Sequence, residues 1–142
     1  MSWLRALHDL HEKAGLLHCD VKEGNVSWDW WTQEATLLDL GFAEPIGTRR
    51  SIMGTYWYTA PEVYDGSKPC SQLTDAYGVG VSVLEHMERH EMIEDDVLED
   101  VAKRLCERDA SKRLSVVDAI KELCSESAGQ GKGGNSGGLE KG

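Results

Sequence analysis

The stretch that most constrains the fold is residues 72–88, where apolar side chains lie on more than one face of a predicted helix. These side chains are Tyr77, Val79, Val81, Val83, Leu84 and Met87. A helix that is apolar on all sides is buried, because none of its faces suits water. We therefore expect residues 72–88 to form a central helix around which the other elements pack.

The other predicted elements are short. Apolar residues at helical spacing predict helices at residues 3–14, 96–107 and 115–123, and short apolar runs predict strands at residues 16–17, 25–28 and 35–38. Gly15 is a suitable stop after the first helix, and Ser115 suits the N-cap of the last. The sequence thus predicts a mainly α fold with a small β-hairpin.

Two segments lack such periodicity. Residues 39–62 contain Gly41, Pro45, Gly47, Gly54 and Pro61. We expect a long, mostly irregular loop there, and connections of this length are usually functional. Residues 125–142 are rich in glycine and are expected to form a disordered tail. One folded domain is then expected at residues 1–124.

The charge balance excludes some functions. The 15 Lys and Arg residues are outnumbered by 25 Asp and Glu, which gives a formal net charge of −10. This argues against a nucleic-acid partner, since phosphate binding needs a basic face. No stretch approaches the roughly 18 continuous apolar residues of a membrane span, and the N-terminus does not resemble a secretory signal. We therefore expect no membrane partner and an intracellular, cytoplasmic location.

Polar side chains gather at places where a plain fold does not need them. Asp20, Lys22 and Asn25 fall on one predicted loop, and Asp39 directly follows a predicted strand. Asp20 could accept a proton from a hydroxyl, and Lys22 could neutralise a phosphoryl group. Asn25 and Asp39 offer the oxygen ligands that Mg²⁺ prefers. Phosphoryl transfer depends mostly on positioning and charge neutralisation, so this set predicts chemistry on a phosphate ester.

Five motifs in order extend this prediction. They are His-x-Asp-x-Lys-x-x-Asn at residues 18–25, Asp-Leu-Gly at 39–41, Gly-Thr-x-x-Tyr-x-Ala-Pro-Glu at 54–62, Asp-x-aromatic-x-x-Gly at 75–80 and Asp-Ala-x-x-Arg at 109–113. In this order and spacing they resemble the eukaryotic protein kinase family, serine/threonine type. The resemblance covers residues 3–123 and corresponds to the family's C-terminal lobe, without its N-terminal β-rich lobe.

The resemblance implies a role for each matched site residue. Asp20 matches the catalytic base, Lys22 matches the contact to the γ-phosphate, and Thr55 matches the threonine that bridges these two. Asn25 and Asp39 match the two metal ligands. ATP and Mg²⁺ are therefore the implied cofactors, and a hydroxyl of a protein substrate is the implied acceptor.

The resemblance also implies structural contacts. Glu62 should form a buried ion pair with Arg113, and Asp75 should hold the backbone of the catalytic loop. His18 and Leu40 should stack with the core as part of the hydrophobic spine of the family.

The chain departs from the family pattern at the site itself. Cys19 stands where the family usually has an arginine that grips a phosphorylated activation loop. Phosphorylation at Thr48, Ser51 or Thr55 is therefore not expected to switch activity in the usual way. Ser27 stands where a leucine usually forms the floor of the adenine site, and a hydroxyl weakens that apolar surface.

The sequence also contains no glycine-rich phosphate loop, no Val-Ala-x-Lys strand and no hinge. Their missing contacts, worth roughly 1.5–3 kcal/mol each, should weaken ATP binding by roughly 10³–10⁴-fold. One reading is a truncated kinase region with weak or no activity alone, which needs a separate N-terminal lobe. The other is a non-catalytic lobe mimic, or pseudokinase, that regulates another kinase by binding it. A fragment without a function of its own is the third reading.

Three tryptophans flank the predicted hairpin turn. Trp28 is expected in the core, whereas Trp30 and Trp31 are expected to be exposed on the turn, where they could serve as a partner-binding knob. The histidine pairs at helical spacing, His8 with His11 and His86 with His90, are expected to be packed or solvated rather than metal-bound. The Cys19 thiol is expected to be inert and partly buried rather than redox-sensitive.

Overall fold

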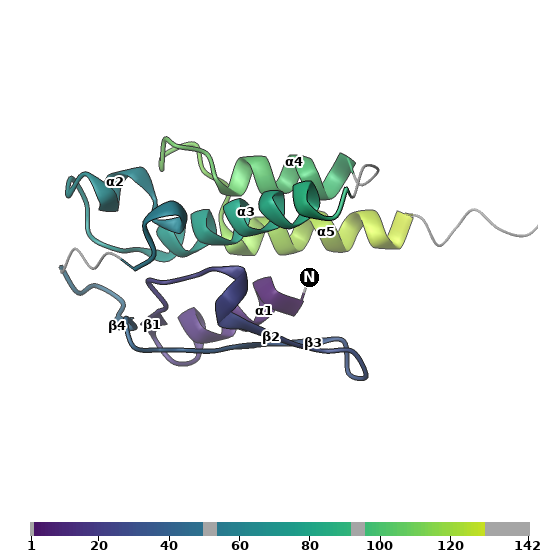
Figure 1. Ribbon diagram of the computed structural model, residues 1–142, viewed down its shortest axis with the longest axis horizontal. Helices are drawn as coiled ribbons and strands as arrows, with labels where there is room; N and C mark the ends of the chain where they lie inside the picture. Colours follow the sequence, from purple (N-terminus) through teal and green to yellow (C-terminus); the bar gives the residue numbers. More distant parts are fainter. Residues whose placement is uncertain (1, 50–53, 92–95, 130–142) are drawn as a thin grey trace, which may run out of the picture.

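The computed structural model describes residues 2–49, 54–91 and 96–129, and these are mainly helical (Figure 1). The helices are α1 (Ser2–Glu12), α2 (Pro61–Tyr64), α3 (Gln72–Arg89), α4 (Asp96–Leu105) and α5 (Val116–Gly129). The strands are β1 (Leu16–Leu17), β2 (Val26–Asp29), β3 (Glu34–Leu37) and β4 (Glu44–Pro45). Two short 3-10 turns occupy Glu23–Asn25 and Tyr56–Tyr58. The predicted fold class, mainly α with a small β-hairpin, is confirmed.

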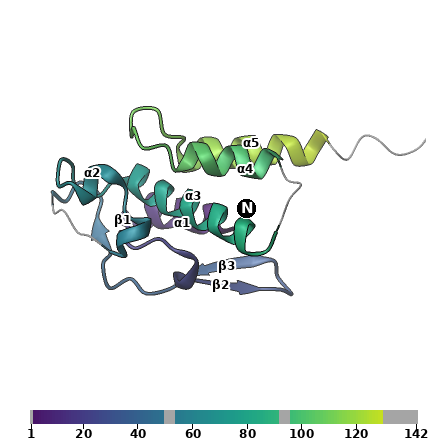
Figure 2. The ribbon, with the colours of Figure 1, turned by 45° about the horizontal axis from the view of Figure 1, so that its top comes forward.

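Helix α3 is the centre of the fold, as its apolar pattern predicts. It packs against α1, α4 and α5, and it runs beside α4 (Figure 1), while the β2–β3 hairpin lies on the side away from α4 and α5 (Figure 2). The main core cluster contains Ala76 and Val79 of α3, with Leu7 of α1 and Val101 and Leu105 of α4. Burial of these side chains from every side fixes the helix relative to its neighbours, since non-polar burial is the main stabilising term of a domain.

A capping box fixes the first turn of α3. The Ser71 hydroxyl accepts a hydrogen bond from the Thr74 backbone N–H at 3.3 Å, and the Thr74 hydroxyl accepts one from the Ser71 N–H at 2.8 Å. These reciprocal bonds satisfy two donors that the helix start would otherwise leave unpaired. The cap therefore sets the position of Asp75, the next residue of the helix.

Gly80 lets α3 and α4 approach closely. A Cβ atom added at Gly80 would lie 2.6 Å from the Ala102 carbonyl oxygen and 2.7 Å from the Cys106 nitrogen. Gly80→Ala should lower the free energy of unfolding by about 1–3 kcal/mol through overpacking, despite the better helix propensity of alanine. Gly24→Ala is the matched control, because the nearest atom to its added Cβ is 3.9 Å away. Urea unfolding of both variants checks this prediction, and equal midpoints would contradict it.

The four strands form two antiparallel pairs. In the hairpin, β2 pairs with β3 from Val26↔Leu37 to Asp29↔Glu34, as the apolar runs predict. Strand β1 pairs with β4, which places Leu16 opposite Pro45 inside the segment that the sequence predicts to be irregular. This pairing ties that segment to the chain just before the candidate catalytic loop.

Two predictions about exposure and boundaries are wrong. Trp28 is 38% exposed rather than in the core, because it lines an open groove with Trp3, Met87 and Leu98 instead of being covered. Helix α5 runs to Gly129, five residues beyond the predicted end of the folded domain at residue 124. Its last turns carry side-chain hydrogen bonds back to the helix, for example from the Ser127 hydroxyl to the Leu123 carbonyl at 2.8 Å. The remainder of the predicted tail, residues 130–142, lies outside the described residues, as does Ser51.

None of the described helices is long and apolar enough to span a membrane.

Candidate active site

The loop that carries the candidate catalytic residues is held by a buried carboxylate of α3. Asp75 is 1% exposed, and its two oxygens accept hydrogen bonds from the backbone N–H groups of His18 (2.8 Å) and Cys19 (2.9 Å). The buried His11 ring of α1 also contacts Asp75, at 2.8 Å. The expected contact of Asp75 with this loop is therefore present. It lets the loop adopt a left-handed backbone at Cys19, where φ is 61°.

His11 is a positioning residue that the sequence pattern does not single out. In the sequence, His11 is simply another histidine in a predicted helix. In the structure, its ring connects α1 to Asp75, the carboxylate that holds the loop. A polar residue on the apolar face of an amphipathic helix is the signal for such a role, because a buried polar group needs a partner.

His18 is fully buried and links the loop to the hairpin. Its Nε2 atom lies 2.9 Å from the Leu38 carbonyl oxygen, and its Nδ1 accepts a hydrogen bond from the Asp20 backbone N–H at 3.3 Å. Leu40, by contrast, does not stack in the core as expected, since it is 48% exposed. The expectation fails because no element among the described residues packs over the end of β3, where Leu38 is exposed too.

Asp20, Thr55 and Lys22 meet in one hydrogen-bonded group. One carboxylate oxygen of Asp20 accepts from both the backbone N–H and the hydroxyl of Thr55, each at 2.7 Å. The Lys22 ammonium donates to the Thr55 hydroxyl at 2.8 Å and lies 3.8 Å from the other Asp20 oxygen. The structure therefore brings together all three residues that the sequence assigns to the catalytic group, from two segments 35 residues apart.

Gly54 makes this approach possible. A Cβ atom at this position would lie 2.6 Å from an Asp20 carboxylate oxygen and 2.6 Å from the Cys19 carbonyl oxygen. Any side chain would push the Thr55 backbone away from Asp20. The close contact between Thr55 and Asp20 therefore requires a residue without a side chain at position 54.

The environment keeps Asp20 ionised. Burial alone would raise the pKa of this carboxyl, but the two hydrogen bonds from Thr55 and the nearby Lys22 charge outweigh burial and lower the pKa below its usual value. Asp20 is therefore a carboxylate at neutral pH, an acceptor poised for the hydrogen of an incoming hydroxyl.

The lowered pKa of Asp20 predicts a pH-dependent stability. A carboxyl whose pKa is lower in the folded state adds stability above its unfolded pKa, and this stability is lost as the pH falls through the folded pKa. We expect the difference in unfolding free energy between the native chain and Asp20→Asn to shrink as the pH falls from about 5 to about 2. Urea unfolding across this range measures it. A difference that does not change with pH would contradict the prediction.

Asn25 is buried beside Asp20, whereas Asp39 is exposed. The Asn25 side-chain amide donates to the Asp20 carbonyl at 2.8 Å and to its carboxylate at 3.1 Å, and among the described residues no hydrogen bond to the Asn25 side-chain oxygen is present. The backbone N–H of Leu38, the residue before Asp39, donates to the Asn25 carbonyl at 2.8 Å. One Asp39 oxygen accepts from the Gly41 N–H at 3.1 Å. An amide oxygen and an exposed carboxylate are a donor set that fits Mg²⁺.

Ser27 lies on β2 with its side chain exposed. Among the described residues it makes no hydrogen bond to the Asp20 group.

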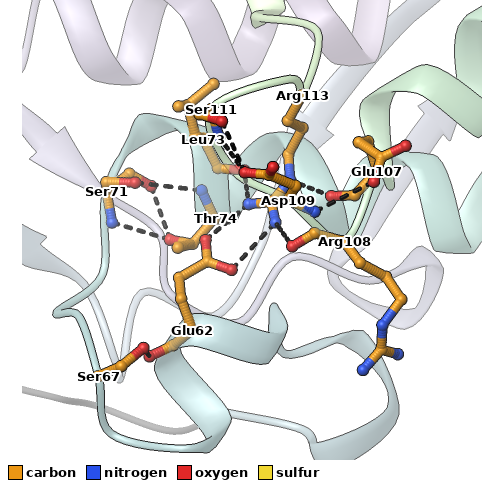
Figure 3. A network of polar contacts seen from close by, with 10 residues as sticks. All are labelled: Glu62, Ser67, Ser71, Leu73, Thr74, Glu107, Arg108, Asp109, Ser111 and Arg113. Carbon is orange, nitrogen blue, oxygen red and sulfur yellow. Dashed lines mark hydrogen bonds and ion pairs between the residues drawn. The ribbon is translucent and has the colours of Figure 1, made fainter.

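Glu62 and Arg113 form a buried ion pair within a network of polar contacts (Figure 3). The guanidinium donates to both Glu62 oxygens, at 2.7 and 3.0 Å, and the Arg113 side chain is fully buried. Burial alone would raise the pKa of Glu62, but Arg113 outweighs it and lowers the pKa. Arg113 also donates to the backbone carbonyls of Leu73, Glu107 and Arg108. The expected pair is thus a hub that joins α2, the start of α3 and the loop before α5.

The Cys19 thiol lies against Cys70 in a small apolar cluster. Hydrogen bonding to Cys70, together with burial, raises the pKa of the Cys19 thiol far above its usual value. Thiolates, not thiols, are the reactive form of cysteine, so this environment agrees with an inert Cys19.

The described residues contain no group of three or more potential metal ligands among His, Cys, Asp and Glu.

Comparison with known proteins identifies the family of the chain. The pattern of the protein kinase domain matches residues 1–101 of the chain. The chain belongs to the protein kinase family. Its resemblance to a eukaryotic kinase of serine/threonine type is therefore confirmed at the level of the family and of the names of its relatives.

Several serine/threonine kinases are similar to this kinase-family chain. It is 33% identical over 95 residues to the serine/threonine-protein kinase mos of Patiria pectinifera, which covers 61% of the chain and 26% of that protein. It is 44% identical over 86 residues to serine/threonine-protein kinase D3 of Mus musculus, covering 56% of the chain and 9% of that protein. A probable LRR receptor-like serine/threonine-protein kinase of Arabidopsis thaliana is 30% identical over 153 residues, which covers 87% of the chain and 25% of that protein.

A solved kinase structure shares the fold. The Cydia pomonella granulovirus kinase PK-1 superposes with a TM-score of 0.66 over 84% of the chain and 54% of that structure, at 24% sequence identity. The chain therefore has the fold of part of a kinase, and it spans only a fraction of the length of each relative.

Proposed function

We propose that the chain is the C-terminal-lobe catalytic region of a protein serine/threonine kinase, which transfers the γ-phosphate of ATP to a protein hydroxyl. The observation that carries this proposal is the Asp20–Thr55–Lys22 group, with one Asp20 oxygen accepting two bonds of 2.7 Å from Thr55. A domain without phosphotransfer chemistry has no need of an ionised carboxylate and an ammonium linked through a threonine.

Each residue has a task in the proposed reaction. The acceptor hydroxyl oxygen forms a bond to the γ-phosphorus while the bond from phosphorus to the leaving oxygen of ADP breaks. Asp20 takes the hydroxyl proton, and Lys22 neutralises charge on the transferred phosphoryl group. Thr55 holds these two side chains at a fixed distance. Asn25 and Asp39 would hold Mg²⁺, which supplies neutralisation of the phosphate charge when bound.

The affinity for ATP in this chain alone is expected to be low. The sequence includes none of the N-terminal motifs that clamp the nucleotide, and the polar Ser27 replaces an apolar floor. We therefore expect this catalytic region to work at full rate only with an N-terminal lobe, whether in the same polypeptide or supplied by a partner.

A second function has one observation in its favour. Leu38, Leu40 and Phe42 are 42%, 48% and 41% exposed in the segment that follows β3, and exposed apolar side chains that gather in one segment favour a binding surface. This favours a non-catalytic lobe mimic that binds another kinase. The mass of the native polypeptide, from immunoblot or intact mass spectrometry, separates the two readings. A mass near 15.7 kDa would favour the binding module, and a species of twice that mass or larger would favour the catalytic region.

Phosphotransfer itself tests the main proposal. The 142-residue chain is incubated with millimolar labelled ATP, Mg²⁺ and a peptide that contains one serine, and the label on the peptide is counted. We expect slow labelling that stops when the metal is chelated, and labelling at least about tenfold lower when the serine is replaced by tyrosine. No labelling of any peptide, by this chain or by the native full-size species, would overturn the proposal.

A further inference from the structure

Two thiols from distant parts of the chain lie against each other beside the candidate catalytic loop. Cys19 belongs to that loop, and Cys70 lies directly before Ser71, the N-cap of α3. Cys70 is buried with Leu17 and Val63 in a small apolar cluster. Cys19 packs against this cluster. The fold thus creates a pair of thiols that the proposed phosphotransfer does not use.

The backbone on both sides of the pair is held by α3. The Cys19 N–H donates to the buried Asp75 carboxylate at 2.9 Å. On the other side, the residue after Cys70 is Ser71, which the capping box bonds to Thr74 of the same helix. Two groups that are already fixed side by side react with each other more readily than with a dissolved reagent, because the entropy of bringing them together has already been lost. The fold therefore favours a bond between these two sulfur atoms.

The surroundings of the pair disfavour a charge on Cys19 but not a neutral bond between the sulfur atoms. The Cys19 thiol donates a hydrogen bond to Cys70, and this bond, together with burial, raises the pKa of Cys19. The nearby carboxylates of Asp75 and Glu44 raise it further. A soft metal ion would need both sulfur atoms as thiolates, which this setting opposes. A disulfide carries no charge, so the setting suits oxidation of the pair better than metal binding.

A small cavity adjoins both thiols. It has a volume of about 20 Å³, and Cys19 and Cys70 line it together with Asp20 and Thr55. A cavity of this size holds one molecule about as large as water. The oxidant must therefore be as small as hydrogen peroxide, whereas bulky thiol reagents do not fit. This agrees with a Cys19 that is inert towards outside reagents, but it leaves Cys70 as a reaction partner.

We propose that Cys19 and Cys70 form a modification site, at which hydrogen peroxide converts the two thiols into a reversible disulfide. The site does not depend on phosphotransfer.

The reaction has two steps. Cys70 reacts first, because the Cys19 proton is held in the hydrogen bond between the thiols. The Cys70 sulfur bonds to one peroxide oxygen, the O–O bond breaks, and a sulfenic acid and water form. The Cys19 sulfur then bonds to the Cys70 sulfur, the S–O bond breaks, and the hydroxyl leaves with the Cys19 proton as a second water. Together the thiols lose two electrons and two protons, and one peroxide is reduced to two waters.

Mass spectrometry of the full chain tests this proposal. The folded chain is treated with excess hydrogen peroxide, the remaining thiols are alkylated in denaturant, and the protein is digested with trypsin. Trypsin cuts after Lys22 and Arg50, so Cys19 and Cys70 fall in separate peptides, neither of which contains another cysteine. We expect these two peptides to be joined, with the loss of two hydrogen atoms, and to separate after treatment with dithiothreitol. The same oxidation in urea should give a mixture of pairings, because the fold no longer holds the thiols together.

Variants separate the pair from general oxidation of cysteine. In Cys70→Ser, the oxidised fraction of Cys19 should fall at least about tenfold, because the thiol has lost the partner that reacts with peroxide first. The matched control replaces both other cysteines, Cys106→Ser with Cys124→Ser. It should form the joined peptides to the same extent as the native chain. Thermal unfolding of the reduced proteins is the folding control, and the double variant keeps the test valid if Cys70→Ser does not fold.

Unfolding shows whether the bond suits the folded structure. The oxidised native chain should unfold at a higher urea concentration than the reduced chain, because a cross-link lowers the conformational entropy of the unfolded state. Reduction before unfolding should remove this gain.

Three results would overturn the proposal. The first is oxidation that only adds oxygen atoms to single peptides and joins none. The second is a joined pair that includes Cys106 or Cys124, or that links two copies of the chain, as often as it links Cys19 to Cys70. The third is a lower urea midpoint for the oxidised chain, which would show that the bond forms only by distorting the fold.

Discussion

Replacing Arg113 with methionine should lower the free energy of unfolding by about 3–5 kcal/mol, because it leaves a buried carboxylate without its partner. The guanidinium makes five hydrogen bonds, two to Glu62 and three to backbone carbonyls. It also lies 5.0 Å above the Tyr77 ring. A loss of this size is a large part of the roughly 5–15 kcal/mol that stabilises a domain. Urea unfolding followed by circular dichroism measures it.

A surface pair gives the matched control for Arg113. Arg104 donates to both Glu122 oxygens, at 2.6 and 2.9 Å, but its side chain is 45% exposed. Arg104→Met should cost less than about 1 kcal/mol, since water screens exposed pairs. Adding Glu62→Gln to Arg113→Met should recover part of the loss by removing the unpaired charge. Equal free energies of unfolding for Arg113→Met and Arg104→Met would contradict the prediction, because the buried pair would then stabilise the fold no more than the exposed pair.

Asp20→Asn should lower the rate of phosphotransfer by about 10²–10⁴-fold, the usual contribution of a positioned acid–base group. Asparagine keeps the shape of the side chain and an oxygen that can accept from Thr55, but it cannot take the hydroxyl proton. Binding to a protein partner should not change. The rate is measured by transfer of labelled phosphate to a serine peptide, in the native chain and in the variant.

The same variant separates the two proposed functions. In a catalytic region, every effect of the protein in its source that depends on phosphotransfer disappears with Asp20→Asn. In a binding module, the effect survives the substitution, because the surface that contacts the partner is intact. Circular dichroism of the variant serves as the folding control. An effect that survives in a folded variant would contradict the catalytic proposal.

Local pattern was enough to predict the elements with strong periodicity. The apolar residues of α3 and the short apolar runs of β2 and β3 placed these three elements within two residues of their observed bounds. The N-cap at Ser115 is also present, with its hydroxyl accepting from the Asp118 N–H at 3.1 Å. The Glu62–Arg113 pair is different. Its residues lie 51 positions apart, and only the family resemblance, not any local pattern, could join them.

Exposure was the part that local pattern could not predict. Leu40 and Trp28 are apolar in the sequence, but whether such a side chain is covered depends on elements that pack over it from elsewhere. The predicted end of α5 was wrong for a related reason. Ser125 and Ser127 interrupt the apolar repeat and favour a tail, yet their hydroxyls donate to the helix carbonyls of Glu122 and Leu123. The helix therefore continues as a polar extension.

The carboxylate of Asp75 has a consequence for how the site comes apart. It joins the amides of His18 and Cys19 to a helix 57 and 56 residues further along the chain, in a place that water does not reach. Those amides can exchange their hydrogens with solvent only when the loop and the central helix separate, because the buried carboxylate accepts both of them. Regions tied to the core in this way share its opening free energy and form one cooperative unit with it. We therefore expect the amides of the candidate catalytic loop to be protected from exchange nearly as well as those of α3.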